Sequence, residues 1–378
     1  MQISLSVENC KLQEGLKFVK PFLGKGKDDT MERCVNMYIT SDHKAILSCS
    51  DKNSWGEIEV ELLGSEGEGA LPNIELDMLL NVITTLNLTQ EIIIKHDSDK
   101  SNSVEMTYQG RKSSIVLNCI EGNFITAPTM NNSEKYDIMG ITLKNGINKA
   151  SEIITNSTSQ EDAIKNCVCL TLAKGKALFE AIDTQTKSMM AYVLATNTNQ
   201  QVRKFFECAK AKFMINSFSD DCMSMYINEN FISFQQGEKR TYLRLLNGNF
   251  FKITKLIPKQ VDKVFKYNRL EMLSALNRVN ALISKSSVIK SCNIKFSNMF
   301  STITSKNTRG VIVEDVICSS TSDEIEMSFM VNTLIKVLNA CVGDDIKISV
   351  VNNGINITSS DGKTYTQSIM IPKISGVN

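Results

Sequence analysis

One apolar stripe recurs three times along this chain, and the repeat limits the folds that the chain can adopt. In residues 267–283 the stripe consists of Met272, Leu276, Val279 and Ile283. Steps of four, three and four residues place these side chains on one side of an α-helix. Matching stripes consist of Leu12, Leu16, Val19 and Leu23, and of Leu143, Ile147, Ala150 and Ile154. Their first members stand 131 and 129 residues apart, which predicts one folding unit used three times.

The length of the chain agrees with this repeat. A chain of 378 residues exceeds one ordinary hydrophobic core, and domains of about 100–200 residues are usual. The tripeptide Gly122-Asn123-Phe124 recurs as Gly248-Asn249-Phe250 at the end of the second unit. We therefore expect domains at 1–130, 136–258 and 262–378, separated by the polar segments 126–135 and 253–263.

Each unit is expected to run strand, helix, strands, helix, strands. The predicted helices are 8–23, 76–86, 145–155, 200–211, 267–283 and 332–341, and alternating apolar segments between them predict strands. This order is typical of an α+β fold whose antiparallel sheets carry helices on one side.

The composition indicates a folded protein and gives little support to a metal site or a cofactor. Apolar residues make up 42% and charged residues 22%, and no segment is apolar enough to span a membrane. The first ten residues show no secretory signal, so a cytoplasmic location is expected. The eleven cysteines have no regular spacing. Cys167 and Cys169 fall on one face of a predicted strand, which favours packed free thiols.

The charge distribution points to a phosphate-binding surface. The predicted helices and their adjoining loops carry 16 Lys and Arg against 7 Asp and Glu, although the whole chain has a net charge of only +1. A basic face with few aromatic residues suits the phosphates of duplex DNA better than the bases of a single strand. The alternative is that these cations are merely solvated.

The sequence contains no motif typical of an enzyme. GxxxxGK[ST], HExxH, GxSxG and the dinucleotide fingerprint are all missing. The run Gly24-Lys25-Gly26-Lys27 follows a helix instead of preceding one, so it predicts a basic loop. Helix-turn-helix and zinc-ligand spacings are missing too, which argues against a transcription factor.

The chain resembles the bacterial β sliding clamps, the processivity subunits of DNA polymerase III. Residues 267–284 (YNRLEMLSALNRVNALIS) are similar to the start of that family's third domain. Residues 3–23, 47–61 and 71–86 resemble its first domain, 244–258 its second junction, and 364–374 its last strand. The resemblance extends over essentially the whole chain.

This resemblance implies a non-enzymatic, head-to-tail homodimer whose three-domain subunits close into a six-domain ring. Helices would line the hole around duplex DNA, and sheets would form the outer wall. The partners implied are the replicative polymerase, the clamp loader and other proteins with a clamp-binding motif. The candidate DNA-facing cations are Lys20, Lys25, Lys27, Lys149, Arg203, Lys204, Arg278 and Lys285.

The family also has a pocket that binds partner peptides. By resemblance it would consist of Leu170, Ile182, Thr184, Thr186, Phe251, Lys255, Leu256, Ile369, Met370, Pro372 and Ile374. The family's Asp-Gly-His-Arg turn is replaced here by 183–186 (DTQT), and its Met-Pro-Met-Arg ending by 371–374 (IPKI). The resemblance thus predicts that the pocket keeps its location, and these replacements leave its peptide preference open. Such divergence fits a phage or mobile-element clamp, or an AT-rich genome.

A second interpretation stays open. The chain could be a non-catalytic ring scaffold that keeps the fold but does not slide on DNA. Pairing of the helix cations with acidic residues on strands would favour that interpretation. A clamp of the eukaryotic type fits less well, because its subunits contain two such domains.

Overall fold

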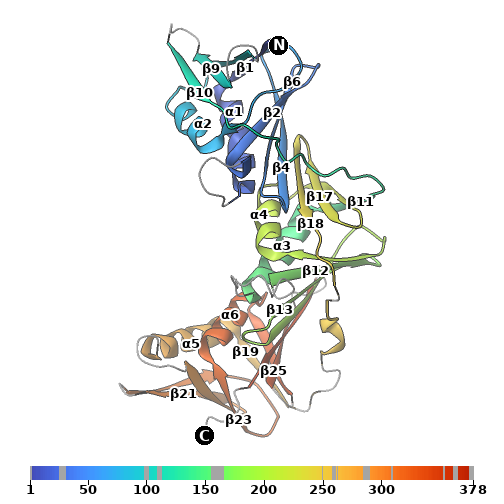
Figure 1. Cartoon of the computed structure of the whole chain (residues 1–378). Helices are drawn as coiled ribbons and strands as arrows, with labels where there is room; N and C mark the ends of the chain where they lie inside the picture. The colour runs from blue at the N-terminus through green and yellow to red at the C-terminus, as the bar shows by residue number, and fades with distance from the viewer. Residues whose placement is uncertain are drawn as a thin grey trace. The chain divides into compact units, whose positions relative to one another are not determined.

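The computed structural model describes most of the chain (Figure 1). The described residues are 2–24, 31–97, 102–108, 113–154, 166–248, 250–257, 261, 263–283, 290–307, 310–351, 354–360 and 365–373. Within them no helix is long and apolar enough to cross a membrane.

Six α-helices occur in the described residues. They are α1 (Asn9–Val19), α2 (Leu76–Ile83), α3 (Gly140–Ile153), α4 (Cys208–Asn216), α5 (Arg269–Ile283) and α6 (Val331–Ala340). The short 3₁₀ helices are η1 (Lys20–Phe22), η2 (Met31–Arg33) and η4 (Ile253–Lys255).

The strands fall into three successive runs. The first contains β1 (Gln2–Glu8), β2 (Cys34–Ile39), β3 (Lys44–Ser50), β4 (Ser54–Glu61), β5 (Gly64–Glu66), β6 (Gly69–Ala70), β7 (Ile74–Glu75), β8 (Glu91–Asp97), β9 (Ser103–Tyr108) and β10 (Ser114–Asn118). The second contains β11 (Glu134–Met139), β12 (Cys167–Ala173), β13 (Lys176–Asp183), β14 (Ser188–Ala195), β15 (Val202–Glu207), β16 (Cys222–Ile227), β17 (Phe231–Gln236) and β18 (Lys239–Arg244). The third contains β19 (Lys263–Asn268), β20 (Ser291–Phe296), β21 (Phe300–Asn307), β22 (Gly310–Ile317), β23 (Ile325–Met330), β24 (Asp345–Val351), β25 (Gly354–Ser360) and β26 (Tyr365–Pro372).

The predicted α+β class with antiparallel sheets is confirmed. In each run one strand precedes a helix, further strands lead to a second helix, and three strands follow it. The helix predicted over 200–211 is wrong in its first half, because residues 202–207 form β15. This strand pairs with β12 from Val202 to Glu207. The hydrogen bonds of that ladder and the burial of Phe206 outweigh the local preference of this short segment.

The sheets run across the expected domain boundaries. β4 pairs with β18 in one long sheet, and β14 pairs with β26 in another. Contacts accordingly divide the chain into two compact units. Unit 1 is Met1–Asp137 with Phe213–Leu245, and unit 2 is Ile138–Lys212 with Leu246–Asn378. The boundaries 1–130, 136–258 and 262–378 stay a prediction.

The three predicted stripes lie in the core. All of their members are buried except Leu23, which is partly exposed. A small residue lies beside each stripe, at Gly15 in α1, Gly146 in α3 and Ala275 in α5. A Cβ atom at position 146 would lie 2.2 Å from the buried ring of Phe179 on β13. The glycine therefore allows α3 to approach its sheet.

The repeated tripeptide also has a repeated backbone conformation. Gly122 has φ +140° and Gly248 has φ +137°. Residues that have a Cβ atom rarely adopt a φ angle in this range, so glycine is required at both positions. The equal angles agree with the idea that both segments close the same kind of unit.

We predict that Gly146→Ala destabilises unit 2 by about 2 kcal/mol, because the added methyl group overlaps a buried ring that has no room to move. Thermal unfolding should show the melting temperature falling by about 5 °C. The matched control is Gly64→Ala, where a Cβ would meet nothing within 4 Å. Equal stability of both variants would contradict the close approach of α3.

Glu57 on β4 generates a pH-dependent prediction. Burial raises the pKa of Glu57 above its ordinary value, against the opposing effects of a hydrogen bond from Tyr242 (3.0 Å) and the Arg240 charge. Because the pKa of Glu57 is higher in the folded than in the unfolded protein, Glu57 contributes most to stability at low pH. This contribution is lost as the pH rises through the pKa of Glu57 in the folded protein. Glu57→Gln should therefore unfold at higher temperature than the parent at pH 8, with a gap that shrinks towards pH 4. A gap that stays constant across this pH range would refute this assignment.

Candidate functional site

The segment after β18 packs against one face of the sheet in unit 2. This face, which does not carry α3, is called the outer face. Phe250 and Ile253 are buried there against Cys167, Cys169 and Ala191. Cys167 and Cys169 share one face of β12, as predicted, and their thiols pack as apolar groups. Burial raises the pKa of Cys169 to about 11, so this thiol stays protonated at neutral pH.

The other side of this segment is exposed and apolar. Phe251 is 67% exposed and Leu256 is 52% exposed. Ile182 and Met189 are partly buried and pack against the same cluster. Lys252 and Lys255 are exposed beside them. Exposed apolar side chains that gather around an anchored segment are typical of a protein-binding surface, and the lysines give it a basic rim.

An ion pair between Arg203 and Glu180 holds the segment in place. Glu180 on β13 is fully buried, and its Oε2 lies 2.9 Å from Nη1 of Arg203. Nη2 of Arg203 donates a hydrogen bond to the carbonyl of Phe251 (3.2 Å). The N–H of Thr254 donates to Oε1 of Glu180 (3.3 Å). A buried carboxylate needs such partners, and here one is Arg203 on β15 and the other is the backbone of the segment after β18.

A second buried carboxylate organises the turn between β13 and β14. Oδ1 of Asp183 accepts the N–H groups of Gln185 (2.9 Å) and Thr186 (3.3 Å). Its Oδ2 accepts a hydrogen bond from Nζ of Lys336 on α6 (3.1 Å). Asp183 is 2% exposed. One carboxylate thus shapes the turn and joins it to a helix from the last third of the chain.

The structure brings only part of the expected pocket together. Ile182, Phe251, Lys255 and Leu256 lie around η4, and Thr184 and Thr186 lie in the turn beyond Ile182. Met370 pairs with Met189, and Pro372 follows on the same strand.

Two expected pocket residues face the other way. Leu170 pairs with Phe179, the residue under α3, and Ile369 pairs with the buried Met190. Strand alternation places both on the helix side of the sheet, where neither is more than 1% exposed. Ile374 lies outside the described residues.

The candidate cations differ in their surroundings. Lys20 in η1 is half exposed and pairs with Asp77 of α2 at 2.7 Å. Lys149 on α3 donates to the carbonyl of Asn339 at 3.2 Å. Burial lowers the pKa of Lys149. Lys25, Lys27 and Lys285 lie outside the described residues.

The remaining three candidates do not share one surface. Arg203 and Lys204 lie on β15, not on a helix, and alternation puts them on opposite faces of the sheet. Arg203 is on the outer face, away from α3. Arg278 on α5 is exposed and bonds to both oxygens of Glu314 on β22, at 2.8 and 2.7 Å. This pair holds the pKa of Glu314 below its usual range.

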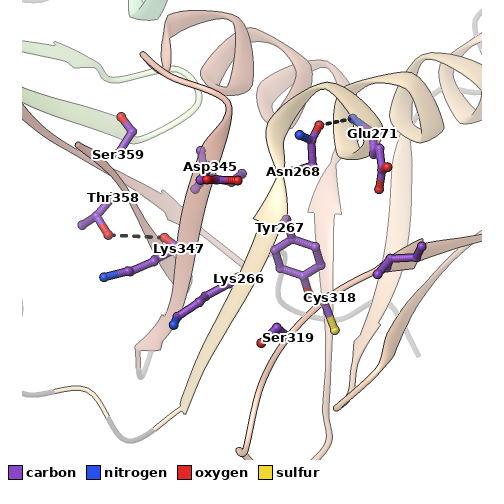
Figure 2. Close-up of a pocket in the computed structure, with 12 residues that line it drawn as sticks. Lys266, Tyr267, Asn268, Glu271, Cys318, Ser319, Asp345, Lys347, Thr358 and Ser359 are labelled. Carbon is purple, nitrogen blue, oxygen red and sulfur yellow. Dashed lines mark hydrogen bonds between the residues drawn. The ribbon is translucent and has the colours of Figure 1, made fainter. Parts of the chain in front are cut away.

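A cavity of about 830 Å³ lies in unit 2, away from all the predicted residues (Figure 2). Lys266 and Lys347 stand opposite each other on β19 and β24, with Asp345 nearby. The hydroxyl of Tyr267 lies 2.6 Å from that of Ser301, and burial raises the pKa of Tyr267, which favours its protonated form.

Two sheet edges carry exposed apolar residues. β22 is the outer strand of a four-stranded sheet in unit 2 and exposes Val311, Val313 and Ile317 by 57–61%. β10 is the outer strand of a five-stranded sheet in unit 1 and exposes Val116 by 61%. Unpaired backbone groups beside apolar side chains make such edges suitable for pairing with another chain.

Sequence reasoning missed the residues that organise this site. Asp183 stands before a polar turn. Because aspartate is common at such positions, the sequence gives only a weak indication of its hydrogen bonds to the turn. Its link to Lys336 left none, because the two are 153 residues apart. Glu180 was overlooked because a single acid in an apolar strand has no periodic pattern.

Among the comparisons with known proteins, only the comparison with solved structures finds similar proteins. No protein-family model matches the chain, and no curated protein matches its sequence. A sliding clamp from Bacillus subtilis has a TM-score of 0.87 at 16% identity, and both chains are covered completely. A putative DNA polymerase III beta subunit from Eubacterium rectale has a TM-score of 0.87 at 15% identity, with 98% of this chain and 99% of that chain covered. The clamp from Thermotoga maritima has a TM-score of 0.83 at 13% identity, covering 99% and 100%.

This chain has the fold of the bacterial sliding clamps. At 13–16% identity it is a divergent example of that fold, and the match extends over the full length of both chains. The clamp fold thus agrees with the resemblance drawn from the sequence. It also accounts for the long sheets that pass from one run of strands to the next.

We predict that Asp183→Ala destabilises unit 2 by about 3 kcal/mol, because it removes two turn bonds and the buried carboxylate that pairs with Lys336. Asp183→Asn should lose less, since an amide oxygen still accepts the turn N–H groups. Chemical denaturation of the two variants measures the difference. Lys295→Ala, which breaks an exposed pair with Glu324, is the control and should cause no measurable shift. Equal losses in both alanine variants would contradict the assigned role of Asp183.

Proposed function

We propose that this chain is a subunit of a DNA sliding clamp, a non-enzymatic ring that encircles duplex DNA and tethers the replicative polymerase. The observation that carries the proposal is the likeness to the Bacillus subtilis clamp over the full length of both chains. A ring needs every part of such a subunit, and a match over one domain would support much less. Contacts between the ring and DNA would involve phosphates and would be independent of sequence.

The ring would close head to tail between two copies of the chain. β22 of one copy would pair with β10 of the other, extending a sheet across the interface and covering Val311, Val313 and Val116. Such an interface joins two different surfaces, and it closes when the rotation between subunits permits. The two exposed apolar edges support this arrangement.

Partner proteins would bind at the surface around η4. Phe251, Leu256 and Ile182 offer apolar contacts for a short peptide, and Lys252 and Lys255 offer charge for acidic residues beside it. The polymerase, the clamp loader and other proteins with a clamp-binding motif are the partners proposed. The turn 184–187 would form one wall, held by Asp183.

One observation favours the second candidate function, a ring scaffold that does not slide on DNA. Arg278 pairs with Glu314, and Lys336 pairs with Asp183, so two helix cations of unit 2 are neutralised by acids on strands. A clamp whose helices carried no available cation would attract phosphates weakly. The two functions differ in one measurable property, retention on closed DNA.

The deciding experiment compares two DNA topologies. The protein is loaded with a clamp loader on nicked circular DNA, and retention is followed before and after the circle is cut. A sliding clamp stays on the circle at moderate salt and runs off the fresh ends, because only topology holds it. A scaffold binds neither form. Equal binding to both forms, falling steeply with salt, would indicate an open phosphate-binding groove and refute the ring.

A variant of the edge strand provides the control. Val313→Glu adds a like charge next to Glu314 and Asp315 on the edge proposed to pair. We expect this variant to sediment as a monomer and to be lost from circles as fast as from linear DNA. Leu88→Glu, an equal change at an exposed residue that belongs to neither edge strand nor to the surface around η4, should remain dimeric and stay on circles. If both variants dimerise normally, closure does not involve β22.

A further inference from the structure

Two lysines that line the cavity of about 830 Å³ in unit 2 stand directly opposite each other. Lys266 on β19 pairs with Lys347 on β24, so both side chains leave the same face of the sheet. Both lysines are exposed, and neither forms an ion pair within the described part of the chain. Like charges directly opposite each other on paired strands destabilise a sheet. An anion bound between the two ammonium groups would remove this repulsion.

Hydroxyl groups flank the two lysines on both sides. Thr358 on β25 stands opposite Lys347, and its hydroxyl has only a long bond of 3.5 Å to the carbonyl of that lysine. Ser319 and Lys266 exchange two backbone hydrogen bonds of 3.0 Å. We call these four cavity-lining residues the cationic row. Ammonium and hydroxyl groups donate hydrogen bonds and ionised phosphate oxygens accept them, so this row is suited to a phosphate group.

A second row, two residues further along each strand, accepts hydrogen bonds instead. Asn268 on β19 pairs with Asp345 on β24, so both lie on the same face as the lysines. Glu271 of α5 and the 61% exposed Ile317 complete this side of the cavity. In the described ranges, neither Asp345 nor Glu271 forms an ion pair. Figure 2 shows Asp345, Asn268 and Glu271 above the two lysines.

The strands beneath the two rows are held by packing on their other face. Tyr267 and Ile346 alternate with the row residues, so their side chains point to that other face, where neither is more than 3% exposed. The hydroxyl of Tyr267 lies 2.6 Å from that of Ser301. The groups of both rows are therefore held at their spacing before a ligand binds. Preformed concave sites of about 300–1,000 Å³ are typical of small-molecule binding.

We propose that this cavity binds a nucleoside phosphate. The phosphate lies on the cationic row, the hydroxyl and amino groups of the nucleoside donate to Asp345 and Glu271, and the base packs against Ile317. A plain inorganic anion would leave the two acids unused, and an uncharged nucleoside would leave the two lysines opposed. The inference goes beyond the proposed clamp function, because this site requires neither a ring nor duplex DNA.

Calorimetric titration of the full chain with ATP, GTP, CTP and UTP tests the site. At least one of the four should bind in the micromolar range. The corresponding nucleoside and inorganic triphosphate should each bind at least about tenfold more weakly, because each reaches only one of the two rows. Failure of all four to bind at millimolar concentration would overturn the proposal. Binding of inorganic triphosphate as tightly as the best nucleotide would overturn it too.

Variants of each row assign the two ends of the ligand. Lys266→Gln and Lys347→Gln should each weaken nucleotide binding by about tenfold and leave nucleoside binding unchanged. Asp345→Ala should weaken the binding of both. The matched control is Lys176→Gln, which removes an exposed lysine from β13 of the same unit, outside the cavity lining, and should bind as the parent does. Unchanged nucleotide affinity in both cationic-row variants would refute the site.

Thermal unfolding separates a loss of binding from a loss of folding. Without nucleotide, Lys266→Gln should melt no lower than the parent, because it ends the repulsion between the opposed lysines. With nucleotide, the parent should melt at a temperature that rises with ligand concentration, and Lys266→Gln should show little rise. Equal rises in both would contradict the proposal. A chain that binds nucleotide but is not retained on closed DNA would refute the clamp function and leave this inference standing.

Discussion

The close approach of the first helix in each run to its sheet is the constraint on which the rest of the structure depends. A Cβ at Gly15 would lie 2.7 Å from Leu47, and one at Gly146 would lie 2.2 Å from Phe179. Ala275 takes the same place in α5 and is 1% exposed. Because each of these three positions holds a small residue, the buried stripe of each helix can pack closely against its sheet. The opposite side of each helix is then fixed as the face that meets solvent.

The sequence predicts the features that depend on regular residue spacing. It does not predict which segments, distant in the sequence, pair with one another. The stripes, the order of elements and the shared face of Cys167 and Cys169 follow from local spacing, and the structure confirms them. Residues 202–207 were misassigned because a short apolar run fits a helix or a strand equally, and only the partner β12 decides. The same error placed Arg203 on the helix side. The buried pairs made by Glu180 and Asp183 join distant segments, so no local pattern marks them.

The apolar stripes and the buried charge pairs together explain how the fold is kept at low sequence identity with known clamps. A stripe tolerates any apolar residue of suitable volume, so the core can be kept while almost every letter changes. The match to the Bacillus subtilis clamp at 16% identity and a TM-score of 0.87 reflects that tolerance. Buried charges are less tolerant, because each must keep its partner. Glu180 with Arg203 and Asp183 with Lys336 therefore fix the segments around η4 more strictly than the core does.

The same reasoning applies to Arg278 on α5 and Lys336 on α6, each of which is held by an acid on a strand of unit 2. Glu314 accepts two hydrogen bonds from Arg278, which also donates to the hydroxyl of Ser274, and the hydrogen bonds and charge of Arg278 lower the pKa of Glu314. If a phosphate drew Arg278 away, an ionised carboxylate would remain beside a second negative charge.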